Sequence, residues 1–141
     1  MAMDEYHIYT DGSCKPNPGR GGWAAIIRKV KSQEEQTIYG AKELVISGSE
    51  AHTTNNRMEM MAVIKALEIL PMPGRITVYS DSLLLVNTMS KNWRRNKNRA
   101  LWEMLDTLTT GHIITWVWVR GHNGHPENER VDTLAQAAAQ I

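Results

Sequence analysis

The pattern of apolar and polar positions changes character partway along the chain, and its first third is typical of β-structure. Three runs rich in β-branched and aromatic residues favour strands at 6–10, 23–30 and 35–45. The polar residues 31–35 are typical of a hairpin connection, so we expect an antiparallel meander. Residues 11–22 contain two prolines and four glycines, which interrupt regular structure, and residues 47–52 are expected to form a loop.

Further along the chain, the apolar residues recur with a helical period. The strongest pattern covers 53–70, where Thr53 or Thr54 can cap the helix and Pro71 ends it. Weaker patterns predict two strands and three more helices, in the order 75–80, 82–93, 100–108, 112–119 and 126–140. The order of elements predicts an α/β fold, a five-stranded mixed sheet of three antiparallel and then two parallel strands with helices on both faces.

Composition sets bounds on the class of protein. A chain of 141 residues with 42% apolar residues is expected to form one domain, residues 1–141, with a core of its own. Cys14 is the only cysteine, so no internal disulfide can form, and a reducing compartment is expected. With no leader pattern and no apolar run of membrane-spanning length, the sequence predicts a cytoplasmic protein.

Two predicted strands each end at an aspartate, Asp11 and Asp81, after a similar tripeptide, Ile-Tyr-Thr or Val-Tyr-Ser. If the two strands are neighbours in the sheet, these carboxylates lie side by side. A buried charge without a partner is costly, so the pair requires something to stabilise it. Glu59 and Asp132 each border the apolar stripe of a predicted helix, which places four acids at the margin of one core.

A divalent cation is the usual means of holding such a cluster of acids together. Ligation by oxygen alone suits Mg²⁺ or Mn²⁺, and neither Cys14 nor the histidines show the spacing of a zinc site. Shared carboxylates can hold two ions roughly 4 Å apart, the arrangement that hydrolyses phosphodiesters. The alternative is that each acid is an ordinary solvated residue. For Glu59 or Asp132 alone that alternative is favoured, but for Asp11 and Asp81 together a functional role is favoured.

The net charge is only +1, so bulk charge does not indicate a nucleic-acid ligand. Positive residues nevertheless cluster in one segment, at Lys91, Arg94, Arg95, Lys97 and Arg99. From composition alone, a solvated helix end and a phosphate-binding surface are equally consistent with this cluster. The aromatic residues Trp102, Trp116 and Trp118 are expected mainly in the core.

Four strings, "YTDGSC", "TTNNRMEMMA", "YSDS" and "GHNGHPENERVD", closely resemble those of the type 1 ribonucleases H and occur in that family's order. The resemblance extends over essentially the whole chain and implies the ribonuclease H-like fold. It also implies that Asp11, Glu59, Asp81 and Asp132 are the four metal-binding carboxylates. The implied activity is endonucleolytic cleavage of RNA paired to DNA, leaving a 5′-phosphate and a 3′-hydroxyl.

By the same resemblance, one Mg²⁺ between Asp11 and Asp132 would activate the attacking water, and a second, on Asp11, Glu59 and Asp81, would stabilise the departing oxygen. Mn²⁺ is a possible substitute. His122 falls on the family's loop histidine, which assists proton movement or product release, a task that suits imidazole near neutral pH.

The resemblance also assigns a substrate surface for an RNA–DNA hybrid. The RNA minor groove would be lined by Gly12, Cys14, Asn17, Asn55 and Asn56. Asn55 and Asn56 also suit a helix start, and the two roles are compatible. Thr54 and Asn98 fall on a pocket for a DNA phosphate, whose third position, often arginine, is His52 here.

The chain departs from the common bacterial pattern between Asp81 and Trp102, which is too short for the usual extra helix and basic protrusion. Leu83 stands where a glutamine that contacts the RNA is common. These departures predict weaker or more salt-sensitive binding of the hybrid. His52 would make that binding weaker or pH-dependent.

Two alternatives stay open at this point. One is the ribonuclease H module of a reverse transcriptase or another nuclease of the same fold, and the other is a non-catalytic hybrid-binding protein. Retention of all four acids favours the enzyme. We expect a monomer with an RNA–DNA hybrid as its partner, no obligatory protein partner and no membrane association.

Overall fold

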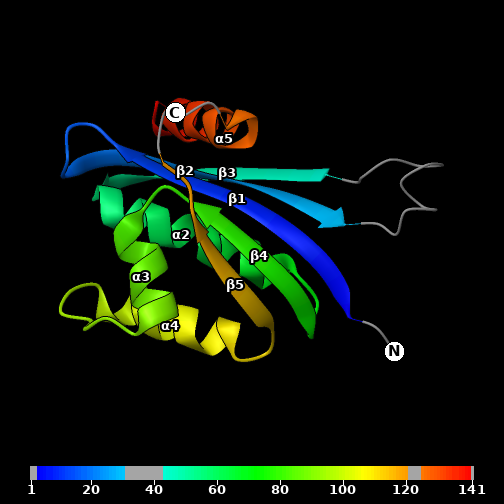
Figure 1. Ribbon diagram of the computed structural model, residues 1–141. Coiled ribbons are helices and arrows are strands. Elements are labelled where there is room, and N and C mark those ends of the chain that lie inside the picture. Colours follow the sequence, from blue (N-terminus) through cyan, green and yellow to red (C-terminus); the bar gives the residue numbers. More distant parts are fainter. Residues whose placement is uncertain (1–2, 31–42, 121–124, 141) are drawn as a thin grey trace.

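The computed structural model describes residues 3–30, 43–120 and 125–140, which form a five-stranded mixed sheet in the order β3-β2-β1-β4-β5 (Figure 1). The strands are β1 (Asp4–Cys14), β2 (Gly19–Val30), β3 (Glu43–Thr53), β4 (Gly74–Ser80) and β5 (Ile113–Trp118). The first three pair antiparallel, and β4 and β5 add in parallel beyond β1. The predicted α/β class and strand arrangement are confirmed.

Helices cover both faces of this sheet, as predicted. They are α2 (Asn55–Ile69), α3 (Leu83–Lys91), α4 (Arg99–Thr109) and α5 (Pro126–Ala139). The main core lies between the sheet and α2–α4, where Ile8, Ile64 and Leu105 are fully buried. On the opposite face α5 packs against β1 and β2 and buries Ile26 and Val131 (Figure 1).

Short polar side chains fix where the helices begin. Thr54 caps α2 by accepting a hydrogen bond of 3.2 Å from the backbone N–H of Arg57. Ser82 caps α3 in the same way. Pro126 occupies the first turn of α5 together with two glutamates, which interact favourably with the helix dipole. None of the described helices is both long and apolar enough to cross a membrane.

The structure corrects the prediction that regular structure stops at Asp11. β1 continues to Cys14, and β2 begins at Gly19, so only four residues form the turn between them. Pairing with β2 sustains the extension, because Asp11 lies opposite Ala24 and Cys14 opposite Gly21. Tertiary pairing here outweighs the weak local strand propensity of glycine and serine.

The predicted loop at 47–52 is also wrong, because these residues belong to β3. Residues 47–50 pair with residues 21–24 of β2, and Gly48 lies against the ring of Trp23. As an edge strand with much of its surface exposed, β3 carries polar residues that resemble a loop in sequence. The predicted hairpin at 31–35 and most of the predicted strand at 35–45 lie outside the described residues.

The three tryptophans assigned to the core do not behave alike. Trp102 is buried, and Trp116 packs against the main core. Trp118 is 43% exposed, so its predicted core role is wrong. It lies at the last position of the edge strand β5, and its indole N–H donates a 3.2 Å hydrogen bond to the carbonyl of Asp81.

Candidate metal centre and nucleic-acid surface

The register of the sheet places Asp11 and Asp81 side by side. β1 and β4 pair in parallel, and their last pair joins Thr10 to Ser80. Each aspartate therefore follows the final pair at the same edge of the β1–β4 ladder, although β1 itself continues along β2. The Thr10 hydroxyl donates to the carbonyl of Tyr79 and ties the two strands together just before the acids.

Glu59 reaches these aspartates from the second turn of α2 because that helix packs very closely on β1. A Cβ added at Gly12 would lie 2.4 Å from the backbone nitrogen of Glu59 and 2.5 Å from the carbonyl carbon of Met58. Only glycine permits that approach, since any side chain would clash with helix backbone. Gly12 thus positions Glu59 by its lack of a side chain.

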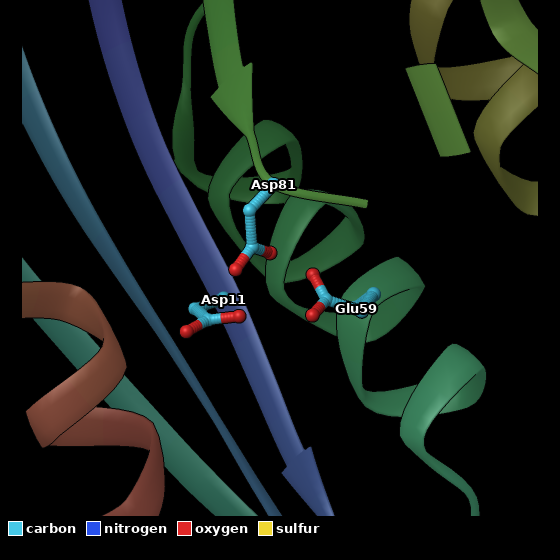
Figure 2. A group of neighbouring side chains, drawn as sticks. All are labelled: Asp11, Glu59 and Asp81. Atoms are coloured by element: carbon cyan, nitrogen blue, oxygen red, sulfur yellow. The ribbon is translucent and has the colours of Figure 1, made fainter. Parts of the chain in front are cut away.

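Carboxylate oxygens of Asp11, Glu59 and Asp81 all lie within 4.8 Å of one another. Figure 2 shows the three groups converging from β1, α2 and the end of β4. Asp11 and Glu59 are only 2% and 5% exposed, so they are ionisable groups buried inside the fold rather than surface acids. The predicted convergence of these three acids is what the structure shows.

Asp132 lines the same hollow from α5, although it stands outside that close group of three. Its Oδ2 accepts a 2.9 Å hydrogen bond from the side-chain amide of Gln136. The close approach of α5 depends on Gly22, where an added Cβ would lie 2.4 Å from the carbonyl oxygen of Ala135. The four acids thus surround one hollow of about 440 Å³, called here the carboxylate hollow.

Burial and mutual repulsion raise the pKa values of Asp11, Glu59 and Asp81. Burial is the main cause that raises the pKa of Asp11 to about 8, and the charges of Asp81 and Asp132 add to it. Burial likewise raises the pKa of Glu59, together with the charge of Asp11. Burial also raises the pKa of Asp81.

The donor set fits hard divalent cations. Within the described part of the chain, Asp11 Oδ2 and Glu59 Oε2 are buried side-chain oxygens without a hydrogen-bond partner. Asp11 Oδ1 accepts a 2.9 Å bond from the backbone N–H of Gly12, which orients the carboxylate. Buried oxygens without partners and ligation by oxygen alone suit a Mg²⁺ or Mn²⁺ ion, whose charge would offset the repulsion that raises these pKa values.

The residues assigned to the RNA groove form a connected rim. Asn55 accepts a 3.1 Å bond from the backbone N–H of Cys14, and its own backbone N–H donates to the side chain of Asn17. Gly12, Asn55 and Asn56 line the carboxylate hollow. The Cys14 side chain is buried, and its thiol points to backbone carbonyls, so the side chain is not available at the rim.

Arg57, which was not among the predicted site residues, connects the two residues assigned to the DNA-phosphate pocket. Its backbone N–H donates to Thr54, and its guanidinium donates a 3.3 Å bond to the side chain of Asn98, at the start of α4. The sequence feature that could have indicated Arg57 is its position in the first turn of α2, three residues after the capping Thr54. His52 is exposed near the end of β3.

A second hollow of about 230 Å³ adjoins the carboxylate hollow, and we call it the cationic groove. It is lined by Asn56, Leu84, Thr88, Arg94, Asn96, Lys97, Asn98 and Trp102. Asn56 and Leu84 line both hollows and so form the boundary between them. Of the predicted basic residues, Arg94 and Lys97 face this groove, whereas Arg95 pairs with Asp106 at 3.0 Å. His122 lies outside the described residues.

The mixed sheet places four carboxylates around one hollow, and a groove with two cationic side chains adjoins it. This combination is compatible with a class of proteins that bind divalent cations and polyanions. Comparisons identify the class further. The family model described as RNase H matches residues 3–140. A ribonuclease H from Thiobacillus denitrificans is 46% identical over 148 positions, which cover 96% of this chain and 93% of that protein. The chain therefore belongs to the ribonuclease H family, enzymes that depend on divalent metals and cleave RNA–DNA hybrids.

Solved structures agree on the fold. LC9-RNase H1, described as a type 1 RNase H with the type 2 active-site motif, superposes with a TM-score of 0.85 at 28% identity. The match covers 99% of this chain and 74% of that one. LC11-RNase H1, solved in complex with an RNA/DNA hybrid, gives a TM-score of 0.71 at 22% identity, covering 96% of each chain.

Proposed function

We propose that this protein hydrolyses the RNA strand of RNA–DNA hybrids endonucleolytically, with two divalent cations, and leaves 5′-phosphate and 3′-hydroxyl ends. The observation that carries the proposal is the carboxylate hollow, where three acids converge within 4.8 Å and a fourth lines the same space. Family membership supplies the substrate class, and the hybrid bound by LC11-RNase H1 is consistent with it.

Asp11 is the ligand that both cations share in this proposal. It would hold one ion with Asp132 and the other with Glu59 and Asp81. Bound Mg²⁺, or Mn²⁺ in its place, supplies Lewis acidity that activates water and stabilises the leaving oxygen. The chain contributes the geometry: the Gly12 N–H fixes one oxygen of Asp11, and the Gln136 amide fixes one oxygen of Asp132. Each bond leaves the other oxygen of that carboxylate free to bind metal.

The two adjoining hollows suit the two strands of a hybrid. The polar rim of Gly12, Asn55 and Asn56 would contact the RNA, whose 2′-hydroxyls both donate and accept hydrogen bonds. Phosphates of the DNA strand would lie in the cationic groove against Arg94 and Lys97, with Thr54 and Asn98 nearby. Leu84, at the boundary of the two hollows, offers an apolar surface between the strands.

The decisive experiment uses a short hybrid with end-labelled RNA, compared with duplex RNA and single-stranded RNA. Each is incubated with Mg²⁺, Mn²⁺ or chelator, using the wild type and the Asp11→Asn variant. Glu68→Gln is a matched control, because it neutralises an exposed acid on the helix that carries Glu59. We expect metal-dependent cleavage of the hybrid alone, lost in Asp11→Asn and kept in Glu68→Gln.

The product ends are tested on the same reactions. A 5′-phosphate blocks labelling by polynucleotide kinase until a phosphatase removes it, so labelling should require phosphatase treatment. Hybrid binding without cleavage under every metal would overturn the proposal in favour of a non-catalytic hybrid-binding protein. The expectation of a cytoplasmic, single-domain monomer without an obligatory protein partner stays a prediction, which light scattering and cell fractionation would test.

A further inference from the structure

The segment that joins α3 to α4 is short and sharply turned at both ends. Residues 92–98, called here the basic connection, begin at Asn92 with a φ of 55° and end at Asn98 with a φ of 58°. Both values lie in the left-handed region, which asparagine tolerates better than most residues. The basic connection supplies four of the eight residues that line the cationic groove.

Arg95 is the anchor of this segment. Its guanidinium donates a 2.7 Å hydrogen bond to the side chain of Asn92 and a 3.0 Å bond to Asp106 on α4. It also lies 5.9 Å from the centre of the Trp102 ring and contacts the sulfur of Met89. A single side chain thereby ties the left-handed turn at the end of α3 to the body of α4.

Arg95 lies on a different side of the basic connection from its cationic neighbours. Arg94, Asn96, Lys97 and Asn98 line the cationic groove, and Arg95 does not. It lines a separate hollow with Arg99, Trp102 and Glu103. Trp102 lines both hollows, and the Arg95 guanidinium lies 5.9 Å from the centre of its ring.

We infer that Arg95 is a positioning residue that fixes the basic connection, so that its neighbours Arg94 and Lys97 present their charges to the groove. The inference deepens the proposed function, since it concerns how the same enzyme grips its hybrid. A short connection without secondary structure loses conformational entropy when it is ordered for binding. An anchor that orders it beforehand strengthens binding without contributing to the chemical step.

Asp106 gives the inference a test in which the direction of the effect is decisive. Replacing this acid near the groove by a neutral residue strengthens binding of a polyanion if only long-range charge matters. If the anchor matters, Asp106→Asn weakens hybrid binding by about 2- to 5-fold, the scale of a single exposed ion pair. The two interpretations of the region therefore predict opposite signs for one substitution.

Arg95→Lys and the matched control Arg28→Lys, which changes another ion-paired arginine, complete the test. Lysine keeps the charge but not the planar fork, so Arg95→Lys should raise Kd and KM for the hybrid by about 5- to 10-fold, with kcat within about 2-fold of wild type. Arg28→Lys should leave all three nearly unchanged, because Arg28 pairs with Glu43 and Glu127 and lines neither hollow. Equal effects of the two substitutions, or tighter binding by Asp106→Asn, would overturn the inference.

Hydrogen exchange of the free protein provides a readout that needs no substrate. In Arg95→Lys and Asp106→Asn the amides of residues 92–98 should exchange faster than in the wild type, while those of β1 and α2 keep their protection. Absence of hybrid cleavage by the wild type would count against the proposed function, whatever the exchange result. Unchanged exchange in 92–98 would count against the anchor alone, so the two failures are distinguishable.

Discussion

The carboxylate hollow and the cationic groove adjoin each other but are built in opposite ways. The acids of the hollow extend from β1, α2, the end of β4 and α5, elements held by backbone pairing and by helix packing on Gly12 and Gly22. The cations of the groove lie on the basic connection, which has no regular structure and is held by side-chain contacts from Arg95. Chemistry that needs sub-ångström geometry lies on rigid elements, and charge that needs only proximity lies on a short connection.

This difference predicts opposite relations between stability and activity in the two regions. The hollow brings like charges together inside the protein, which is destabilising until a cation neutralises them. The groove carries exposed cations, which cost the fold little. Neutralising an acid of the hollow should therefore lower activity and raise stability, whereas substitutions in the groove should affect binding alone.

The largest expected effect is that of Glu59→Gln. Glutamine has nearly the same shape and cannot carry the charge that the buried site disfavours, so the fold should be preserved. We expect cleavage of the hybrid to fall by about 10³-fold, the scale of losing a transition-state interaction in a metal site. At pH 8 without metal, the same variant should unfold at higher denaturant concentration than the wild type. Lower stability than wild type would contradict the view that the acids oppose folding.

The next largest expected effect is the pH dependence of the free energy of unfolding, which tests whether the buried acids oppose folding. The folded-state pKa values of Asp11 and Glu59 are raised, so between about pH 4 and pH 8 the folded state holds more protons than the unfolded state. Stability contributed by these groups is therefore present at low pH and is lost as the pH rises towards 8. In chelator, the free energy of unfolding should fall by about 2–4 kcal/mol between pH 5 and pH 8.

Denaturant titrations across that pH range would measure this slope, and added Mg²⁺ should abolish it by stabilising the charged acids. The slope is best compared as the difference in free energy of unfolding between the wild type and Glu59→Gln at each pH. That difference cancels other titrating groups, such as His112, whose pKa burial lowers. A slope that is the same in both proteins, with or without Mg²⁺, would show that the acids are not coupled to folding.

The two regions also differ in what the sequence could predict. That Asp11 and Asp81 lie together followed from two apolar runs ending in acids, because parallel neighbours bring equivalent positions together. The length of β1 and the strand at 47–52 could not be predicted, because both depend on pairing with β2 and not on local propensity. The close contact at Gly12 is likewise invisible in a pattern, since it arises only when α2 docks.

The basic connection was less predictable still. Composition grouped Arg94 and Arg95 as equivalent cations, and nothing local distinguishes them. Their difference depends on the left-handed turn at Asn92, which directs one guanidinium towards Asp106 and leaves the other at the groove. Tertiary geometry decides which of several neighbouring arginines forms an ion pair within the fold. The sequence therefore predicts a positively charged surface, but not which arginine faces the groove.

The smallest expected effect is that of single cation removals in the groove. Because each phosphate contact releases counterions, Arg94→Gln and Lys97→Gln should each reduce the slope of log K against log salt by about 0.7–0.9. Affinity at low salt should fall several-fold, while kcat and the free energy of unfolding stay at the wild-type values. Fluorescence anisotropy with a labelled hybrid between 50 and 200 mM salt, as suits such titrations, would measure the slope. A change in unfolding free energy in either variant would break the contrast, since it would mean that the groove, like the hollow, is coupled to the stability of the fold.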